Sequence, residues 1–281
     1  MTRCAPSCLA PLLLLTAGAE PPTRGIDIEL IAESRSIQPG KPFTLGLAIH
    51  HHEGFHTYWQ NPGIVGVPTS IEWDMPEGFQ AGPIQWPTPE KVDMAGHPAH
   101  GYERDVLLMV EVTPPESLDM ASCTFRASAS WMACAASCHP GSRTLSTTLP
   151  VESDASGDGP DDPRFEAARS ELPRPLANWA GTWQSDASGT GITIHLQPPS
   201  GQKPIESVYF FSSDGQISSD QPQTLTLTRD GGLSLAMKRC EFSPETRKVL
   251  PGVFQVQSND GSVTLGCIDL KKDEKPTLPK P

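Results

Sequence analysis

Residues 123–151, CTFRASASWMACAASCHPGSRTLSTTLPV, contain two runs of alternating apolar and polar residues on either side of a cysteine pair. A period of two is typical of strands that bury one face, so we predict strands over 123–131 and 143–151. Three small residues separate Cys134 from Cys138. A disulfide needs Cα atoms within about 7 Å, whereas four steps of extended strand span about 13 Å. A bridge between these cysteines therefore requires the chain to turn between them.

The same alternation recurs along most of the chain. Thirty prolines and 24 glycines favour short elements joined by turns over long helices. Before the cysteine pair we predict strands over 26–33, 42–50 and 105–112. After it we predict strands over 191–196, 206–211, 223–228, 232–238, 252–257 and 262–267. The sequence therefore predicts an all-β protein built from two antiparallel β-sandwiches in tandem.

Composition indicates where the two sandwiches are divided. The stretch ESDASGDGPDDP, 152–163, is acidic and rich in Gly and Ser, as solvated linkers are. Asp162 and Pro163 then predict the start of a short helix with Phe165, Ala168 and Leu172 on one face. The expected organisation is a first sandwich over 24–152, a linker and short helix over 153–175, a second sandwich over 176–270 and a disordered tail over 271–281.

The N-terminus has the features of an export signal. Arg3 precedes an apolar run, and Ala17-Gly18-Ala19 fits a cleavage site, which predicts a signal peptide over 1–19. No other segment approaches 18 consecutive apolar residues, so we expect no stable membrane insertion. The mature protein is expected to be periplasmic or secreted, where disulfides persist.

Several function classes find no support in the sequence. The formal net charge is −12 and no block of Lys and Arg offers a footprint for phosphates, which argues against nucleic acid as a partner. GxGxxG, Walker and GxSxG motifs are absent, so a nucleotide enzyme and a serine hydrolase are unsupported. HEGFH, 52–56, has the spacing of HExxH, but that zinc-protease motif requires a helix and these residues are expected at a strand end beside a turn, so a zinc protease is unsupported too. We expect no cofactor.

Cleavage of the signal would leave five cysteines, an odd number, so at least one thiol is free or pairs transiently. A Cys134–Cys138 bridge closes about five residues and would stabilise the fold by only about 2 kcal/mol. A Cys240–Cys267 bridge closes about 28 residues and would contribute about 3.6 kcal/mol. We therefore predict that Cys240 and Cys267 form a structural disulfide, that the 134–138 pair is suited to exchange, and that Cys123 is buried.

His139 adds to the exchange hypothesis, because a neighbouring imidazolium can lower the pKa of a thiol. Three alternatives remain. The pair could be a static clamp on a hairpin, or Cys134, Cys138 and His139 could hold Cu(I), since thiolates are soft ligands. A module that only binds other proteins is the third. The histidines of HHHEGFH, 50–56, alternate between two faces of a strand, so they are not expected to bind one ion.

Four spaced motifs carry a resemblance to a known family. They are GFHTYWQNPGIVGVPTSIEW (54–73), PIQWPTPEK (83–91), HGYERDVLLMV (100–110) and WMACAASCHPG (131–141). Together they resemble the N-terminal periplasmic region of thiol:disulfide interchange proteins of the DsbD type. Further along, VYFFSSDGQISSDQPQTLTLTRDGGLSLAMKR (208–239) followed by PGVFQV resembles the second sandwich of one branch of that family. The resemblance is closest to the branch called suppressor of copper sensitivity protein B.

The resemblance implies immunoglobulin-like sandwiches and a redox-active pair at Cys134 and Cys138, carried on a strand-turn-strand hairpin. Tyr102 and the turn at 59–63 fall in the motifs and are candidate supporting residues, with packing as an equally good explanation. The membrane and thioredoxin-like parts of the family are not found here, so we expect recharging by a separate membrane electron carrier. Periplasmic thiol or disulfide proteins are the expected partners; the direction of electron flow stays open.

Overall fold

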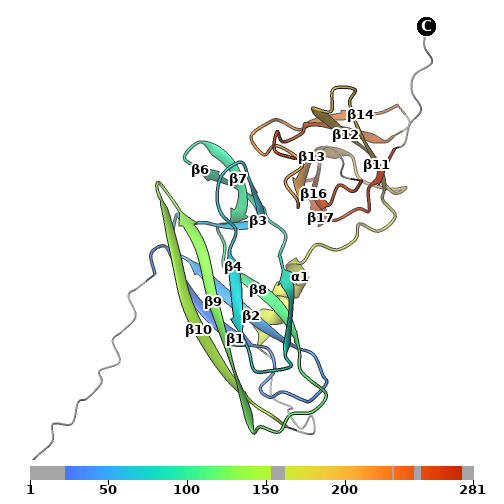
Figure 1. The fold of residues 1–281 in the computed structure, drawn as a ribbon. Coiled ribbons are helices and arrows are strands. Elements are labelled where there is room, and N and C mark those ends of the chain that lie inside the picture. The colour runs from blue at the N-terminus through green and yellow to red at the C-terminus, as the bar shows by residue number, and fades with distance from the viewer. Residues whose placement is uncertain (1–22, 153–161, 230, 244–247, 274–281) are drawn as a thin grey trace, which may run out of the picture.

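The computed structural model describes residues 23–152, 162–229, 231–243 and 248–273 (Figure 1). Strands dominate these residues, in several sheets, with one short helix. The predicted signal peptide, most of the acidic linker and residues 274–281 of the tail lie outside the described residues.

The first part of the chain forms two sheets that face each other. One has the order β1 (Ile26–Ala32), β2 (Phe43–His51), β8 (Val106–Thr113) and β5 (Gln80–Gln85). The other has the order β10 (Cys138–Pro150), β9 (Ser122–Cys134) and β4 (Ser70–Asp74). Alternate side chains of β2 and β8 meet those of β9 in a shared core that includes Leu45, Val110 and Phe125. The alternation seen in the sequence thus places one face of each strand in this core.

A small third sheet lies at the end of the β9–β10 hairpin that bears the cysteines (Figure 1). It has the order β3 (Thr57–Gly63), β7 (His97–Tyr102) and β6 (Glu90–Met94). Cys134 N–H donates to the His56 carbonyl and His56 N–H to the Cys134 carbonyl, both at 2.9 Å. These two bonds join the third sheet to the tip of β9.

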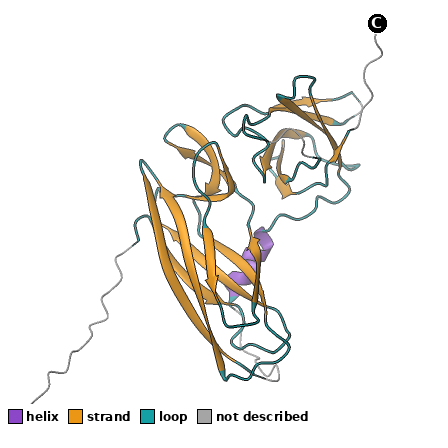
Figure 2. Ribbon diagram, in the orientation of Figure 1, coloured by secondary structure: helices purple, strands orange, loops and turns teal. Residues whose placement is uncertain are grey.

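The helix predicted after the linker is α1, Pro163–Glu171. Asp162 caps it by accepting a hydrogen bond from Arg164 N–H, and Pro163 occupies the first turn, where no N–H is needed. Phe165 and Ala168 are buried against Leu107 and Met109 of β8, on the sheet face opposite the main core. Figure 2 shows the helix lying alongside the strands of the first part of the chain. The helix therefore covers the outer side of this sheet, and the prediction of its position is confirmed.

The rest of the chain forms two more facing sheets. One has the order β14 (Thr224–Leu227), β15 (Leu233–Lys238), β12 (Gly191–Gln197), β11 (Ala180–Ser185) and β18 (Lys271–Lys272). The other has the order β13 (Ile205–Ser212), β16 (Gly252–Ser258) and β17 (Val263–Gly266). Trp183, Leu235 and Phe254 lie in the core between them.

One boundary needs correction. Disorder was expected from residue 271, yet Lys271 and Lys272 pair in parallel with Thr182 and Trp183 of β11. Asp273 N–H also donates to the Trp183 carbonyl at 2.8 Å. Charge and proline content suggested a tail, but the free edge of β11 supplies backbone partners that composition does not reveal.

The two halves of the molecule meet through aromatic side chains. Trp59 and His100 of the first half pack against Phe211, with ring centroids 6.4 and 4.9 Å away. His100 Nε2 also lies 3.0 Å from the Tyr209 hydroxyl. Lys91 Nζ lies 4.1 Å from the centre of the Tyr209 ring, a cation–π contact. This junction joins β13 to the third sheet, and the third sheet in turn lies next to the tip of the β9–β10 hairpin.

Burial at this junction predicts acid sensitivity. Desolvation lowers the pKa of His100 from 6.5 to about 4. Between pH 6.5 and 4 the unfolded chain therefore binds a proton at His100 that the folded protein does not. We expect the free energy of unfolding to decrease as the pH is lowered through that window, by up to about 3 kcal/mol from this residue.

Urea unfolding at several pH values measures this effect. His100→Leu should flatten the pH dependence, whereas His97→Leu, at an exposed position of the same strand, should leave it unchanged. Equal slopes for the wild type and His100→Leu would contradict the assignment.

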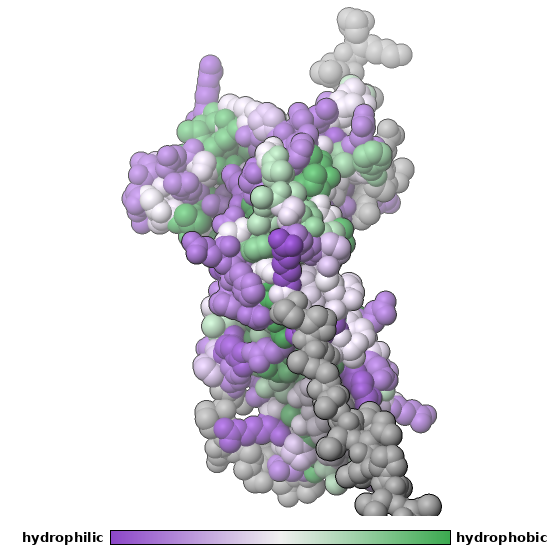
Figure 3. All heavy atoms as spheres, turned by 90° about the vertical axis from the view of Figure 1, so that its left-hand side faces the viewer, coloured by the Kyte–Doolittle hydropathy of each residue, from purple (hydrophilic) through white to green (hydrophobic). Residues whose placement is uncertain are grey.

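Hydrophilic residues cover much of the face in Figure 3, and the exposed apolar side chains form separate patches. The large exposed apolar residues of the described chain include Ile64, Leu227 and Phe242, which lie far apart in sequence. Within the described ranges, no helix has the length and apolar character to cross a membrane.

Candidate thiol–disulfide site

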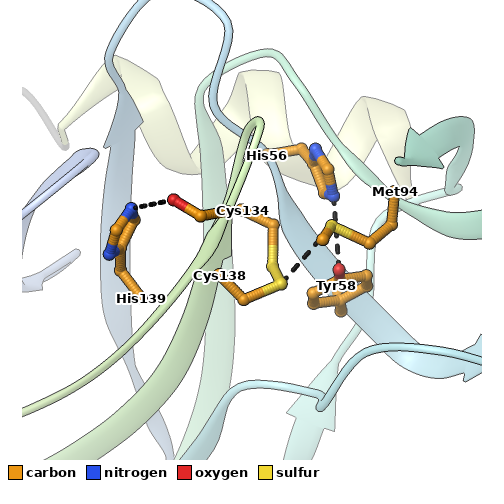
Figure 4. The surroundings of a disulfide bond; sticks show 7 residues. His56, Tyr58, Met94, Cys134, Cys138 and His139 are labelled. Atoms are coloured by element: carbon orange, nitrogen blue, oxygen red, sulfur yellow. Dashed lines mark hydrogen bonds between the residues drawn. A yellow bond between two sulfur atoms is a disulfide. The ribbon is translucent and has the colours of Figure 1, made fainter.

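Cys134 and Cys138 form a disulfide that closes the β9–β10 hairpin (Figure 4). They are register partners, and their Cα atoms lie 4.1 Å apart. Both backbone groups of Cys134 bond to His56, so the cysteines occupy a non-hydrogen-bonded pair of the hairpin, the position where facing residues approach most closely. The turn that the spacing required is confirmed.

The two sulfurs have different surroundings. Cys134 is fully buried, in a small apolar cluster with Tyr58, Val92 and Ala99 of the third sheet. Cys138 is exposed. Its Sγ lies 3.4 Å from the Sδ of Met94, at the end of β6 (Figure 4). A reagent or partner can therefore reach Cys138 but not Cys134.

His139 is not beside the sulfurs. Successive residues of a strand point to opposite faces, and Figure 4 shows His139 on the other side of the hairpin from Met94. Its Nε2 lies 3.0 Å from the Ser137 hydroxyl. The expectation that its imidazolium acts on the neighbouring thiol is therefore not met, because adjacency in sequence does not give a shared face.

The position of His139 also bears on the hypothesis that Cys134, Cys138 and His139 together hold Cu(I). Cys134, Cys138 and His139 do not converge on one point in this state. In the described part of the chain, no group of three or more His, Cys, Asp or Glu is placed to hold a metal.

The residues that do adjoin the disulfide come from the third sheet. His56 binds Cys134 through its backbone, and its ring nitrogen lies 3.4 Å from the Tyr58 hydroxyl. Burial lowers the pKa of His56 and raises the pKa of Tyr58, so both are neutral near pH 7. Sequence reasoning missed these two residues and Met94 as neighbours of the site. The motif GFHTYW could have indicated the first two, but nothing in the sequence around Met94 marks it.

Tyr102 has a packing role in this structure. Its side chain is almost fully buried, and its hydroxyl donates to the Pro87 carbonyl at 2.7 Å. Trp59, in the motif turn, is also in the core. Each helps to hold the third sheet, and neither belongs to the cluster around Cys134.

The predicted disulfide between Cys240 and Cys267 is wrong: both are free cysteines. Cys240 follows β15 and bonds through its N–H to the Gln216 carbonyl, whereas Cys267 follows β17 and bonds to the Arg174 carbonyl. The two strands belong to different sheets, so strand-end positions along the chain did not imply proximity. Cys123 is buried and unbridged, as expected.

Met94 lies against one side of Cys138 Sγ, which gives a prediction. Met94→Ala should speed reduction of the Cys134–Cys138 bond by excess dithiothreitol severalfold, because the attacking thiolate gains access to Cys138. Quenching the reduction by alkylation at successive times, followed by mass spectrometry, measures the rate. Met120→Ala, which removes the thioether beside Cys123 instead, is the matched control. Equal rates for both variants would show that Met94 does not restrict access.

Two comparisons agree with this geometry. Residues 29–150, which include the hairpin and the third sheet, match the family described as thiol:disulfide interchange protein DsbD, N-terminal. This part of the chain is therefore similar to the DsbD N-terminal domain family.

The chain is also similar to the crystal structure of the N-terminal periplasmic domain of ScsB from Proteus mirabilis. The TM-score is 0.61 at 18% identity, covering 90% of this chain and 96% of that one. At this identity the likeness shows a shared fold. No curated protein sequence matches the chain.

Proposed function

We propose that this protein exchanges thiols and disulfides with partner proteins through Cys134 and Cys138. One observation carries the proposal: the disulfide joins an exposed sulfur to a buried one. A structural staple gains from burial of both sulfurs, whereas exchange requires in-line access to one of them. The family of residues 29–150 supports the same chemistry.

The proposed reaction assigns separate roles to the two cysteines. In the reduced protein the Cys138 thiolate attacks a partner disulfide, forms a mixed disulfide and releases one partner thiolate. The Cys134 thiolate then attacks Cys138 Sγ, which reforms the intramolecular bond and releases the second partner thiolate. The partner gains two electrons and the protein loses two. The reverse sequence recharges the protein from a reduced donor, for which we propose a separate membrane electron carrier.

The same relationship supports three further parts of the proposal. The similar ScsB domain is periplasmic, which together with the signal-like N-terminus supports a periplasmic or secreted location. Periplasmic thiol or disulfide proteins are then the partners. Each pair of facing sheets is proposed to be an immunoglobulin-like domain, with the boundary between the two in the linker and helix over 153–175.

Reversible titration of the native protein tests the exchange function. In dithiothreitol and oxidised dithiothreitol at varied ratios, Cys134 and Cys138 should convert between disulfide and dithiol without unfolding, as measured by alkylation and peptide mass mapping. Cys123 serves as an internal control, since its labelling should not follow the redox ratio. A bond that is reduced only after denaturation would identify a static clamp and overturn the proposal.

Cu(I) binding is a second candidate, favoured by one observation. After reduction, the Cys138 thiol would lie beside the Met94 thioether, and both are soft ligands. Competition of the reduced protein against a Cu(I) chelator tests it. Stoichiometric binding that is lost in both Cys138→Ser and Met94→Leu would support a copper role, and binding equal to that of the oxidised protein would exclude it.

A further inference from the structure

The outer edge of β10 has no part in the exchange chemistry described above. Among the described residues, this thirteen-residue strand has β9 as its only neighbour in the sheet. Because Cys134 and Cys138 form a non-hydrogen-bonded pair, Cys138 directs its N–H and C=O away from β9. The register continues without a bulge, so every second residue of β10 does the same. The outward positions are Cys138, Pro140, Ser142, Thr144, Ser146, Thr148 and Pro150.

Two observations support this assignment. Both prolines of the strand occupy outward positions, where a missing N–H removes no ladder bond. The outward carbonyl of Pro150 accepts a hydrogen bond from Ile37 N–H at 2.9 Å. From Ser142 to Thr148 the outward backbone groups bond to no other described residue. The edge therefore offers a row of donors and acceptors on the same strand as the exposed sulfur.

A groove of about 780 Å³ runs beside this edge. It is lined by residues 139–144 of β10, by Thr23 and Arg24, and by β9 around Trp131. The Trp131 indole packs directly over Gly141, where a Cβ would lie 2.6 Å from the ring. Among the described residues that line the groove, the ionisable ones are Arg24, His139 and Arg143, and none is Asp or Glu. This described lining is thus basic in a chain whose formal net charge is −12.

We propose that the free edge of β10 docks an extended, acidic segment of the exchange partner, which adds to the sheet as a strand and delivers the partner's cysteine to Cys138. The inference rests on the proposed exchange function. An extended polypeptide is the ligand whose donors and acceptors repeat at the spacing of a strand edge. The basic groove selects acidic side chains on that segment.

Pro140 fixes where the pairing ends. It presents a carbonyl but no N–H at the outward position between Cys138 and Ser142, so the added strand pairs from Ser142 onward. Ser142 and Cys138 are four positions apart along the strand, about 13 Å. In an antiparallel arrangement, the partner's cysteine follows its paired segment by about four residues. Cys138 Sγ is left free for sulfur chemistry.

Two probes separate docking from chemistry. One is 5,5′-dithiobis(2-nitrobenzoate), which has no peptide backbone. The other is a peptide of alternating Glu and Val, followed after four residues by a cysteine joined to 5-thio-2-nitrobenzoate. The reduced Cys138 thiolate attacks the peptide cysteine and expels 5-thio-2-nitrobenzoate, which is coloured. Cys134 then displaces the peptide thiol and reforms the protein disulfide.

Thr144→Pro removes an outward N–H without breaking a bond to β9. It should slow the peptide reaction about tenfold, equivalent to about 1.4 kcal/mol, and leave the reaction with the small probe unchanged. Thr144→Ala should change neither rate. N-methylation of the peptide at alternate residues should slow its reaction with the wild type similarly. Replacing its Glu residues with Lys should also slow the reaction, by a factor that shrinks at high salt.

The outcomes distinguish the two proposals. Failure of both probes to release 5-thio-2-nitrobenzoate with reformation of the disulfide would refute the exchange function. Reaction of both probes, with a peptide rate unaffected by Thr144→Pro and by N-methylation, would overturn the docking proposal alone. A wild type that sediments as a dimer and becomes a monomer in Thr144→Pro would also overturn it, since a second copy would then occupy the edge.

Discussion

Cys134→Ala should trap partners as stable mixed disulfides, whereas Cys138→Ala should trap none. The exposed Cys138 thiolate can still attack a disulfide when Cys134 is absent, but no second thiol is then positioned to release the product. In Cys138→Ala the remaining sulfur is fully buried beneath the third sheet and unreachable. In both variants the rate of the two-electron exchange reaction should fall to that of the uncatalysed reaction.

Non-reducing gel electrophoresis and mass spectrometry with glutathione disulfide measure this asymmetry. Cys134→Ala should gain one glutathione adduct at Cys138 within the time in which Cys138→Ala gains none at Cys134. Cys123→Ala, at a buried thiol remote from the hairpin turn, is the control and should keep wild-type exchange. Equal adduct formation at both positions would contradict the assigned roles.

Phe125→Ala should lower the free energy of unfolding by about 3–5 kcal/mol. The Phe125 ring is fully buried on β9, the strand that carries Cys134, with its centroid 5.4 Å from Phe43 and 5.2 Å from Phe79. Truncation removes these contacts and leaves a cavity between two sheets that cannot close together. Because the free energy of unfolding of a domain is typically about 5–15 kcal/mol, this loss is a large part of the total.

Chemical unfolding monitored by tryptophan fluorescence gives the comparison. Phe242→Ala is the matched control, since that ring is 92% exposed and its truncation should change the free energy of unfolding by less than about 0.5 kcal/mol. A loss below about 1 kcal/mol for Phe125→Ala would mean that the two sheets do not share the core described here.

The sequence by itself determined the elements with clear alternation. β1, β2, β8, β9 and β10 follow runs of period two, and α1 begins where Asp162 and Pro163 predict. The turn between Cys134 and Cys138 followed from reach alone, since no extended chain brings the two sulfurs together. These features are local: each depends on residues within a few positions of one another.

Strands β3 to β7 were not predicted, apart from the motifs they contain. β5 (QAGPIQ) and β7 (HPAHGY) have no clean alternation, because their side chains are buried unevenly and β5 and β3 depart from regular pairing. Their pairing partners lie elsewhere in the chain. Local propensity is therefore weak in this region, and tertiary contacts decide its structure.

Only the tertiary structure decided which residues share the site with the two cysteines. His139 is next in sequence but points to the other face, whereas Met94, more than 40 positions away, touches Cys138. Cys240 and Cys267 were predicted to pair because each lies at a strand end, but the two strands belong to different sheets. Spacing fixes what neighbouring residues can reach, and only the pairing of distant strands fixes which residues meet across the fold.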